Sequence, residues 1–271
     1  MSSNLLVGKR GIITGALDEN SIAWKTAVKA HEQGAKIILT NAPIAMRMGK
    51  INALAEQLSS KVISADATNT EDINKLLTES QEFLGGKIDF VLHSIAQSPN
   101  IRKNIPYAEL NYEYYSKTLD ISALSLHKIL SAAYKADAIN EWGSVVALSY
   151  IAAQRTFSFY TDMADAKALL ESVVRSFGYH YGKFRKVRVN SVSQSPTKTT
   201  AGGGIKGFDT FFDFAELNSP LGNASAESCA EYCVSLFSDY TKMVTMQNLY
   251  HDGGYSFTGA SADLMDKFGG E

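Results

Sequence analysis

The chain has 271 residues, 45% of them hydrophobic, and a formal net charge of −2. This balance gives no electrostatic reason to expect a nucleic acid or an anionic membrane as a partner. The first residues lack the features of a signal peptide and no apolar run is long enough to span a bilayer, so the sequence predicts a cytoplasmic protein without membrane segments.

No metal site is expected either. The five histidines form no metal-binding motif. Cys229 and Cys233 are four positions apart in a predicted helix, a spacing that suits neither an unstrained disulfide nor a four-ligand zinc site. We therefore interpret both cysteines as buried thiols.

Apolar stretches of strand length alternate with helical patterns along the chain. Strands are predicted at 11–13, 36–40, 62–65, 88–93, 145–149, 187–192 and 248–251. Helices are predicted at 21–33, 52–59, 71–84, 113–135, 161–181 and 226–237. Such alternation implies parallel strands joined by right-handed crossovers, with both faces of the sheet covered. The sequence thus predicts an α/β protein whose residues 1–271 form a single domain around a Rossmann-like, doubly wound parallel sheet.

Residues 195–222 depart from this alternation. They combine three consecutive glycines with four phenylalanines and contain no clear strand. Long irregular segments in compact domains are usually lids or binding loops. We therefore expect a substrate-binding flap with an apolar underside, in which the glycines at 202–204 act as a hinge.

In a doubly wound sheet, ligands bind at the carboxyl ends of the strands near the switch point. After the first predicted strand, Gly15 turns the chain, and Ser21 and Ile22 begin a helix whose free N–H groups suit a pyrophosphate. After the third strand, Asp66 precedes Ala67 and can accept a hydrogen bond from an adenine amino group. Capping of the next helix explains Asp66 equally well.

Two further strand ends carry small or turn-forming residues. The fourth strand is followed by Ser94, Ile95 and Ala96, where small side chains allow a cofactor to pass close to the backbone. The sixth is followed by Pro196, Thr197 and Thr199, where the chain can turn toward a nicotinamide amide. Their shared position at successive strand ends favours a dinucleotide site.

Tyr160 and Lys167 stand seven positions apart in the sequence. Tyr160 comes just before the helix predicted at 161–181, and Lys167 lies within it. Seven helical steps place two side chains within roughly 20° of each other, about two turns apart. A phenol and an ammonium could then line one cleft, with Tyr150 at the end of the fifth strand beside them. The alternative is a half-buried tyrosine and a lysine whose stem covers apolar surface.

Several motifs follow one another along the chain: SIAWK (21–25), LHSIA (92–96), LSYIAAQR (148–155), FYTDMADAKALLE (159–171), VRVNSVSQSPTKT (187–199) and HDGG (251–254). In kind and order they resemble the motifs of enoyl-acyl-carrier-protein reductases, a branch of the short-chain dehydrogenase/reductase superfamily. The resemblance spans about residues 5–258. The Tyr-x6-Lys spacing is specific, because other members of the superfamily use Tyr-x3-Lys and a serine in place of Tyr150.

The resemblance implies hydride transfer from NADH to the β-carbon of a trans-2-enoyl thioester in fatty acid biosynthesis. Tyr160 would donate a hydrogen bond to the thioester oxygen, Lys167 would bind the nicotinamide ribose, and Tyr150 would assist. The expected substrate contacts are Ala96, Tyr150, Tyr160, Met163 and Phe208. The resemblance further implies a homotetramer and an acidic acyl carrier protein as partner, for which Lys206 matches one basic docking position.

Cofactor preference is inferred from the end of the second strand. An NADP enzyme would usually place arginine or lysine there, whereas this chain has residues 41–43 as Asn-Ala-Pro. We therefore favour NADH, and Arg47 keeps NADPH open. Lys25 replaces a glycine of the family pattern, and we expect it to point away from the phosphates.

Two other functions remain as alternatives. One is a carbonyl reductase or alcohol dehydrogenase of the same superfamily, against which the absence of serine at position 150 argues. The other is a cofactor-binding regulator that has lost catalysis, for which damage at Tyr160 or Lys167 would be expected.

Overall fold

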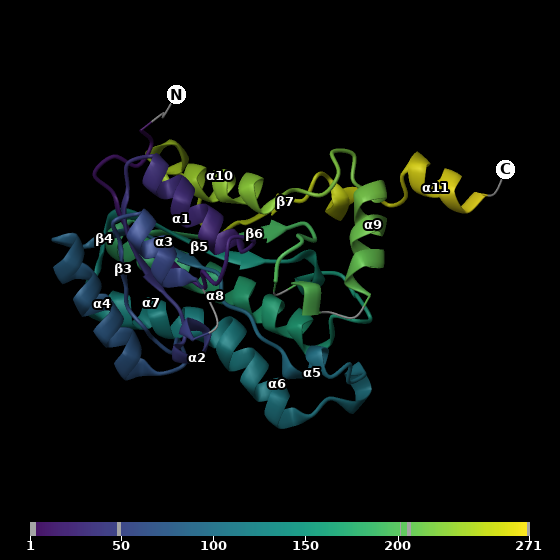
Figure 1. Ribbon diagram of the computed structural model, residues 1–271, viewed down its shortest axis with the longest axis horizontal. Helices are drawn as coiled ribbons and strands as arrows, with labels where there is room; N and C mark the ends of the chain where they lie inside the picture. The colour runs from purple at the N-terminus through teal and green to yellow at the C-terminus, as the bar shows by residue number, and fades with distance from the viewer. Residues whose placement is uncertain (1–3, 48–49, 201, 205–206, 270–271) are drawn as a thin grey trace.

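The computed structural model describes residues 4–47, 50–200, 202–204 and 207–269. Within them, parallel strands form one seven-stranded sheet in the order β3-β2-β1-β4-β5-β6-β7 (Figure 1). The strands are β1 (Arg10–Thr14), β2 (Lys36–Thr40), β3 (Lys61–Val62), β4 (Ile88–His93), β5 (Ile139–Ser149), β6 (Arg188–Gln194) and β7 (Asn248–His251). The order reverses between β1 and β4, so the switch point lies where the two halves of the sheet meet.

Helices cover both faces of the sheet. The longer ones are α1 (Ile22–Glu32), α3 (Ile51–Gln57), α4 (Thr70–Leu84), α6 (Tyr112–Leu119), α7 (Ser125–Lys135), α8 (Thr161–Arg185), α9 (Phe208–Asn218), α10 (Ala226–Phe237) and α11 (Ala262–Gly269). Two short helices are α2 (Pro43–Met46) and α5 (Pro99–Arg102). Short 3-10 turns are η1 (Tyr107–Glu109), η3 (Ile151–Ala153), η4 (Gly202–Gly204), η5 (Asp239–Thr241) and η6 (Tyr255–Phe257).

Two buried clusters hold the layers together, because alternate strand residues point to opposite faces. On one face, side chains of β1, β4 and β5 such as Ile12, Val91 and Val145 pack against α4, α7 and α8. On the other, neighbouring positions such as Ile13 and Leu92 pack against α1, α3 and α10. This three-layer arrangement confirms the predicted fold class, a Rossmann-like doubly wound parallel sheet.

Several predicted boundaries are wrong in detail. The third strand is predicted at 62–65, whereas β3 pairs only at Lys61–Val62; beyond it the chain stays hydrogen-bonded to β2 and its loop through the N–H groups of Ile63 and Ala65. The helix predicted at 113–135 is interrupted by a π-helical turn, η2 (Asp120–Leu124). Such turns occur mostly inside α-helices near functional sites, and a hydrophobic period does not reveal them.

The segment predicted as an irregular flap contains an 11-residue helix, α9, after the turn η4. Its four phenylalanines gave no clean amphipathic pattern, since aromatic side chains lie on more than one side of it. Residues 201, 205 and 206 lie outside the described residues, and with them the predicted docking residue Lys206. The C-terminal helix α11 projects from the body of the molecule beside α9 (Figure 1). No helix in the described part of the chain is both long and apolar enough to cross a bilayer.

Candidate active site

The tyrosines Tyr150 and Tyr160 meet at the carboxyl end of β5. Tyr150 directly follows the last strand residue, and its ring centroid lies 5.1 Å from that of Tyr160, at an interplanar angle of 56°. Tyr150 is buried and its hydroxyl has no hydrogen-bond partner among the described residues. Burial raises the pKa of both phenols above the usual value of 10, so each stays protonated at neutral pH and can act as a donor.

Lys167 approaches the same strand end from the second turn of α8. Its ammonium donates a hydrogen bond of 2.7 Å to the carbonyl oxygen of Leu148, and its side chain is buried. Burial lowers the pKa of Lys167 to about 8, while the nearby carboxylate of Glu171 raises it. The lysine is therefore mainly charged at neutral pH, and its ammonium is fixed at the end of β5, by the carbonyl two residues before Tyr150.

Glu171 was not identified in the sequence, although it lies one helical turn beyond Lys167. It is buried, and its carboxylate accepts hydrogen bonds from the Ser149 hydroxyl at 2.7 Å and from the Gln154 amide at 3.0 Å. Gln154 in turn accepts from the hydroxyl of Tyr250 on β7 at 2.7 Å. The i, i+4 spacing from Lys167 was the signal that could have revealed Glu171.

The structure brings Tyr160 and Lys167 to one strand end, but the expected reason is wrong. Tyr160 is not within the helix: it caps α8, and Thr161 follows it with φ +37°. A β-branched residue with positive φ breaks the regular helical rotation between the two side chains. Their convergence comes instead from β5, where Tyr160 packs on Tyr150 and Lys167 bonds to Leu148.

At the switch point, the turn after β1 lies close to the end of β4. Gly15 has φ +84°, and a Cβ added there would come within 1.9 Å of the Ser94 carbonyl oxygen. Ser21 caps α1 by accepting the N–H of Trp24 at 3.2 Å, which leaves Ile22 at the start of the helix. A glycine turn that leads into a helix N-terminus is the arrangement that binds a pyrophosphate. Lys25 does not point there, because its ammonium lies 3.7 Å from Glu227 on α10, as predicted.

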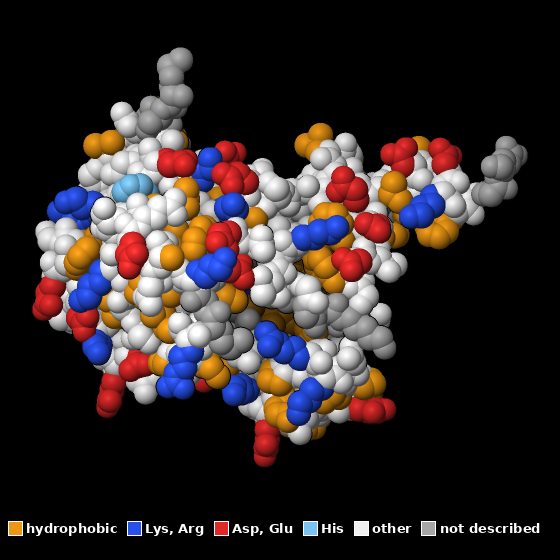
Figure 2. All heavy atoms as spheres, viewed as in Figure 1, with side chains coloured by type: hydrophobic (Ala, Val, Ile, Leu, Met, Phe, Trp, Pro, Cys, Tyr) orange, Lys and Arg blue, Asp and Glu red, His pale blue; other side chains and the backbone are white. Residues whose placement is uncertain are grey.

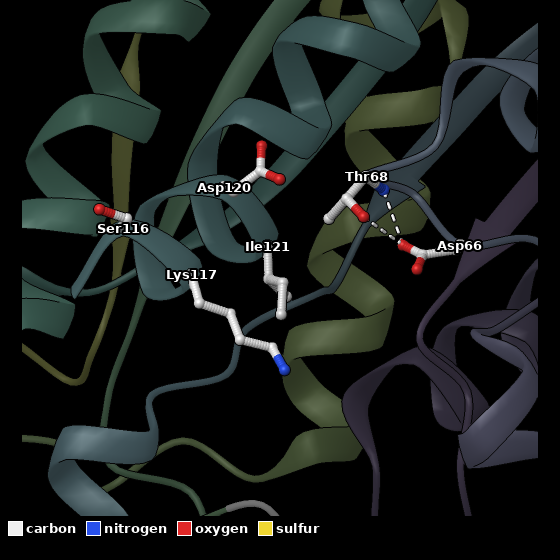
Figure 3. Close-up of a pocket in the computed structure, with 6 residues that line it drawn as sticks. All are labelled: Asp66, Thr68, Ser116, Lys117, Asp120 and Ile121. Carbon is white, nitrogen blue, oxygen red and sulfur yellow. Dashed lines mark hydrogen bonds between the residues drawn. The ribbon is translucent and has the colours of Figure 1, made fainter. Parts of the chain in front are cut away.

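Beyond β3 an open cavity of about 480 Å³ is lined by Asp66, Thr68, Ser116, Lys117, Asp120 and Ile121 (Figure 3). One carboxylate oxygen of Asp66 accepts from the N–H and the hydroxyl of Thr68 at 2.8 and 2.7 Å. The other oxygen is directed away from Thr68 (Figure 3). Ala67 packs against the core beside it. Asp66 thus makes a local turn with Thr68 and does not cap the next helix, so the capping alternative is wrong: Asn69 caps α4.

The loop after β2 presents no cation at its start. The side-chain amide of Asn41 accepts the N–H of Ala42 at 2.9 Å and donates to the carbonyl of Ala16 at 3.0 Å. Arg47 lies after α2 and is exposed. Asn41 thus braces the loops after β1 and β2, where a ribose 2'-hydroxyl would lie.

The loop after β6 folds toward the switch point. Pro196 is buried, and the Thr197 hydroxyl donates to the carbonyl of Ser195 at 3.0 Å. Thr199 accepts the N–H groups of the turn η4 through its carbonyl and hydroxyl oxygens. Its neighbour Thr200 donates to Asp18 of the β1–α1 loop at 2.6 Å. The loops after β1 and β6 therefore meet across the site.

Aromatic rings from the flap complete the site. Phe211 of α9 has its ring centroid 6.4 Å from that of Tyr150, 5.4 Å from that of Phe157 and 5.0 Å from that of Phe159. Figure 2 shows a hollow between α9 and the rest of the domain, with hydrophobic side chains visible inside it. Phe208, the phenylalanine expected at the substrate, has its ring centroid 6.2 Å from that of Phe212 instead. The hydrophobic pattern alone did not indicate which phenylalanine faces the tyrosines.

The remaining predicted residues lie in α8 and after β4. Met163 is buried with Ile101 in a cluster on which Tyr160 packs. After β4, Ser94 and Ile95 are half-buried and Ala96 is exposed. His93, just before them, is buried and bonds to Ser125 at 2.8 Å. Burial, with the charge of Lys167, lowers the pKa of His93 to about 3, so this imidazole stays neutral at physiological pH.

Comparison with known proteins supplies a family context. Residues 15–256 match the family described as Enoyl-(Acyl carrier protein) reductase. NADH enoyl-acyl-carrier-protein reductase 1 of Rhizobium meliloti is 34% identical over 263 residues, which cover 96% of this chain and 95% of the relative. The corresponding FabI protein of Rickettsia bellii is 34% identical, with 96% and 98% covered.

Solved structures agree in both fold and sequence. The FabI–NADH complex from Alistipes finegoldii superposes with a TM-score of 0.95 and 60% identity, covering 97% of this chain and 93% of that one. The NADH enoyl-acyl-carrier-protein reductase from Aquifex aeolicus superposes with a TM-score of 0.88 and 31% identity, covering 95% and 100%.

Proposed function

The chain belongs to the enoyl-acyl-carrier-protein reductase family, and from this premise we propose how its own residues reduce an enoyl thioester with NADH. The reaction is the reduction of the trans-2 double bond of an enoyl-acyl carrier protein in fatty acid biosynthesis. One observation carries the proposal: Tyr160 and Lys167 converge on the end of β5, where a tyrosine and not a serine stands at position 150.

The described residues fit a dinucleotide cofactor. The close approach of Gly15 to Ser94 leaves no room for a side chain, as expected where a pyrophosphate passes over backbone. The cavity beside Asp66 has space and an acceptor for an adenine amino group. Lys167 would hold the nicotinamide ribose, and Pro196, Thr197 and the small residues after β4 would border the nicotinamide. When bound, NADH supplies the hydride that adds to the β-carbon of the substrate.

Tyr160 supplies the hydrogen bond that this addition requires. As the hydride reaches the β-carbon, the π-electrons move toward the carbonyl and negative charge develops on the thioester oxygen. The Tyr160 hydroxyl, kept protonated by its raised pKa, donates to that oxygen and stabilises the enolate. A proton from solvent at the α-carbon then completes the saturated thioester. Tyr150 lies beside Tyr160 and offers a second protonated hydroxyl to the same region.

Lys167 and the aromatic rings set the charge and the polarity around the two tyrosines. The Lys167 ammonium is held by the Leu148 carbonyl. Its positive charge would stabilise the developing enolate from a distance, without a direct hydrogen bond to it. The rings of Phe157, Phe159 and Phe211 surround the tyrosines with apolar surface that excludes water and suits an acyl chain. Because α9 carries one of these rings, we expect the flap at 195–222 to cover the bound acyl chain. The glycines at 202–204 are the proposed hinge.

The experiment is an assay of NADH oxidation with crotonyl-CoA and enoyl-acyl carrier protein, set against a panel of ketones and aldehydes. We expect enoyl-dependent oxidation and none with the carbonyl compounds. Oxidation with ketones alone would establish the carbonyl reductase instead, and cofactor binding without turnover of any substrate would establish the regulator. The same assay with NADPH tests whether Arg47 admits the 2'-phosphate.

Assembly and location belong to the same proposal. We propose a homotetramer, which light scattering of the purified protein tests directly, and the acyl carrier protein as the partner that delivers the substrate. The two buried cysteines, Cys229 and Cys233, are both free, which suits a reducing cytoplasm. Fractionation of cells that express the protein tests this location.

A further inference from the structure

A buried carboxylate next to Tyr160 has no part in the chemistry described above. Asp162 stands at the second position of α8 with none of its surface exposed. Ser98 and Thr161 donate to its Oδ1 at 2.7 and 3.1 Å, and Asn100 and Thr118 donate to its Oδ2 at 2.8 Å each. In the described part of the chain no lysine or arginine forms an ion pair with Asp162. Its charge is instead satisfied by four side-chain donors and by the positive end of α8.

Three of these donors come from two other elements, α5 with its cap and α6. Ser98 caps α5 and also accepts the N–H of Ile101 at 3.0 Å, while Thr118 lies on α6. The amide of Asn100 also donates to the carbonyl of Asn111, which caps α6, at 3.3 Å. Asp162 therefore fixes the start of α8 against α5 and α6 through groups that are themselves buried.

The network reaches Tyr160 by two routes. Along the chain, Thr161 lies between Asp162 and Tyr160 with φ +37°, a conformation that a β-branched residue keeps only where its surroundings enforce it. The Thr161 hydroxyl donates to Asp162, which ties this strained residue to the network. Through space, Ile101 belongs to the buried cluster on which the Tyr160 ring packs.

We propose that Asp162 is a positioning residue, which holds the Tyr160 hydroxyl at the place where the thioester oxygen becomes charged. The proposal rests on the enoyl reduction proposed above. Removal of the carboxylate takes the acceptor from the hydroxyls of Ser98 and Thr161. It leaves Asn100 and Thr118 only the backbone carbonyls of Asn111 at 3.3 Å and Tyr114 at 2.9 Å, so α5, α6 and the turn at Thr161 would rearrange. A hydroxyl misplaced by about 1 Å loses much of its effect on the rate. None of the four donors to Asp162 is a proposed cofactor contact, so NADH binding should change little.

The test is a double-mutant cycle between Asp162 and Tyr160. We expect Asp162→Ala to lower kcat for crotonyl-CoA about tenfold or more, with the Kd of NADH changed less than about twofold. Asp162→Asn should restore most of the activity, because one amide oxygen can still accept from Asn100 and Thr118 while the hydroxyls of Ser98 and Thr161 rotate to accept. In a Tyr160→Phe background, Asp162→Ala should slow the residual reaction less than about twofold.

A matched control lies one turn along the helix. Asp165 accepts from the hydroxyls of Tyr107 and Tyr115 at 3.2 Å each, so Asp165→Ala also removes a carboxylate that joins α8 to neighbouring segments. Asp165→Ala should lower thermal stability and leave kcat near wild type. A merely structural role for Asp162 would make the two alanine variants alike, or would slow the reaction by the same factor with and without the Tyr160 hydroxyl. Either result overturns the proposal.

Thr118→Val keeps the test decisive if Asp162→Ala does not fold. This substitution preserves shape and removes one donor to Oδ2, and it should lower kcat about threefold only when the Tyr160 hydroxyl is present. An equal loss in both backgrounds contradicts the positioning role. Failure of the enoyl reductase function itself gives a different result, since then wild type and every variant would show no enoyl-dependent NADH oxidation.

Discussion

The Lys167 ammonium donates a hydrogen bond of 2.7 Å to the carbonyl oxygen of Leu148, two residues before Tyr150. The next residue, Ser149, donates to Glu171, one turn beyond Lys167 on α8. The last residues of β5 are thus bonded to α8 at two successive positions. Lys167 is therefore held by a strand end that leads directly into Tyr150.

Tyr160→Phe is expected to lower kcat much more than NADH affinity. The hydroxyl is proposed to contact the substrate oxygen mainly when that oxygen is charged, and loss of one such donor costs roughly 2.7 to 4 kcal/mol, or about a hundredfold to a thousandfold in rate. Stopped-flow turnover and NADH fluorescence titration measure the two quantities. Tyr150→Phe serves as the comparison, because its hydroxyl lies beside the first. A fully active Tyr160→Phe enzyme would remove Tyr160 from the mechanism.

The pH dependence should report Lys167. Burial lowers the pKa of this lysine to about 8 from its usual 10.5, so its charge is lost as the pH rises through about 8. We expect turnover and NADH affinity to fall over the same range. Lys167→Arg keeps its charge throughout, and it should shift the fall to higher pH even if its activity is lower.

Thermal denaturation over the same pH range separates this effect from unfolding. Between about 8 and 10.5 the unfolded chain holds a proton on Lys167 that the folded protein has released, so the contribution of this group to stability rises with pH. Activity should therefore decline above pH 8 without a matching loss of stability from Lys167. A pH profile that is identical in wild type and Lys167→Arg would assign the decline to another group.

The fold was predictable because its signals are local. Strand β4 is buried at five of its six positions, as expected for a parallel strand covered on both faces, and the helices between the strands carry periodic apolar stripes. The π-turn η2 and the short helices α2 and α5 were missed. A hydrophobic period does not encode a single extra residue in a helical turn, and a four-residue helix has too few positions for a period.

The positions of Gly15 and Tyr150 were predictable because each directly follows a strand, β1 and β5. The pairing of Tyr160 with Lys167 was predicted from helical rotation, yet Thr161 interrupts that rotation with a positive φ. Tertiary contacts with β5, which a sequence does not display, make the two side chains converge. Glu171 and Phe211 were missed for the same reason. Glu171 is linked to the site by its hydrogen bond from Ser149, and Phe211 by its ring contact with Tyr150, and both are tertiary contacts.

Phe211→Ala should impair long substrates more than short ones. The Phe211 ring lies over Tyr150 and Phe157, where an acyl chain is proposed to lie, so its loss removes apolar contacts of about 1 kcal/mol, or roughly a fivefold rise in KM. Crotonyl-CoA has only one carbon beyond its double bond, so it should be affected less than an enoyl thioester of eight or more carbons. Phe214→Ala is the control on α9, because Phe214 is 37% exposed. Equal KM changes for short and long substrates would place Phe211 outside the acyl site.

Gly15→Ala should weaken NADH binding more than the same substitution at Gly85, another glycine with positive φ. Gly15 has φ +84°, and the added methyl would lie 1.9 Å from the Ser94 carbonyl oxygen, so the turn after β1 and the loop after β4 must separate. Both border the proposed pyrophosphate path. Gly85→Ala is the matched control, because Gly85 has φ +73° at the end of α4 but open space around it. Left-handed backbone costs an L-residue roughly 1–2 kcal/mol, which both variants share.

Thermal denaturation and NADH fluorescence titration on the two variants distinguish the backbone strain of a positive φ from the steric clash with Ser94. Gly85→Ala should lose only the shared strain energy and bind NADH as wild type does. Gly15→Ala should lose more stability and raise the Kd of NADH about tenfold or more, or roughly 1.4 kcal/mol. Because a ligand stabilises the folded state less when its Kd is higher, the same concentration of NADH should recover less stability in Gly15→Ala than in the control. Equal NADH affinity in both variants would show that the cofactor does not pass over the Gly15 turn.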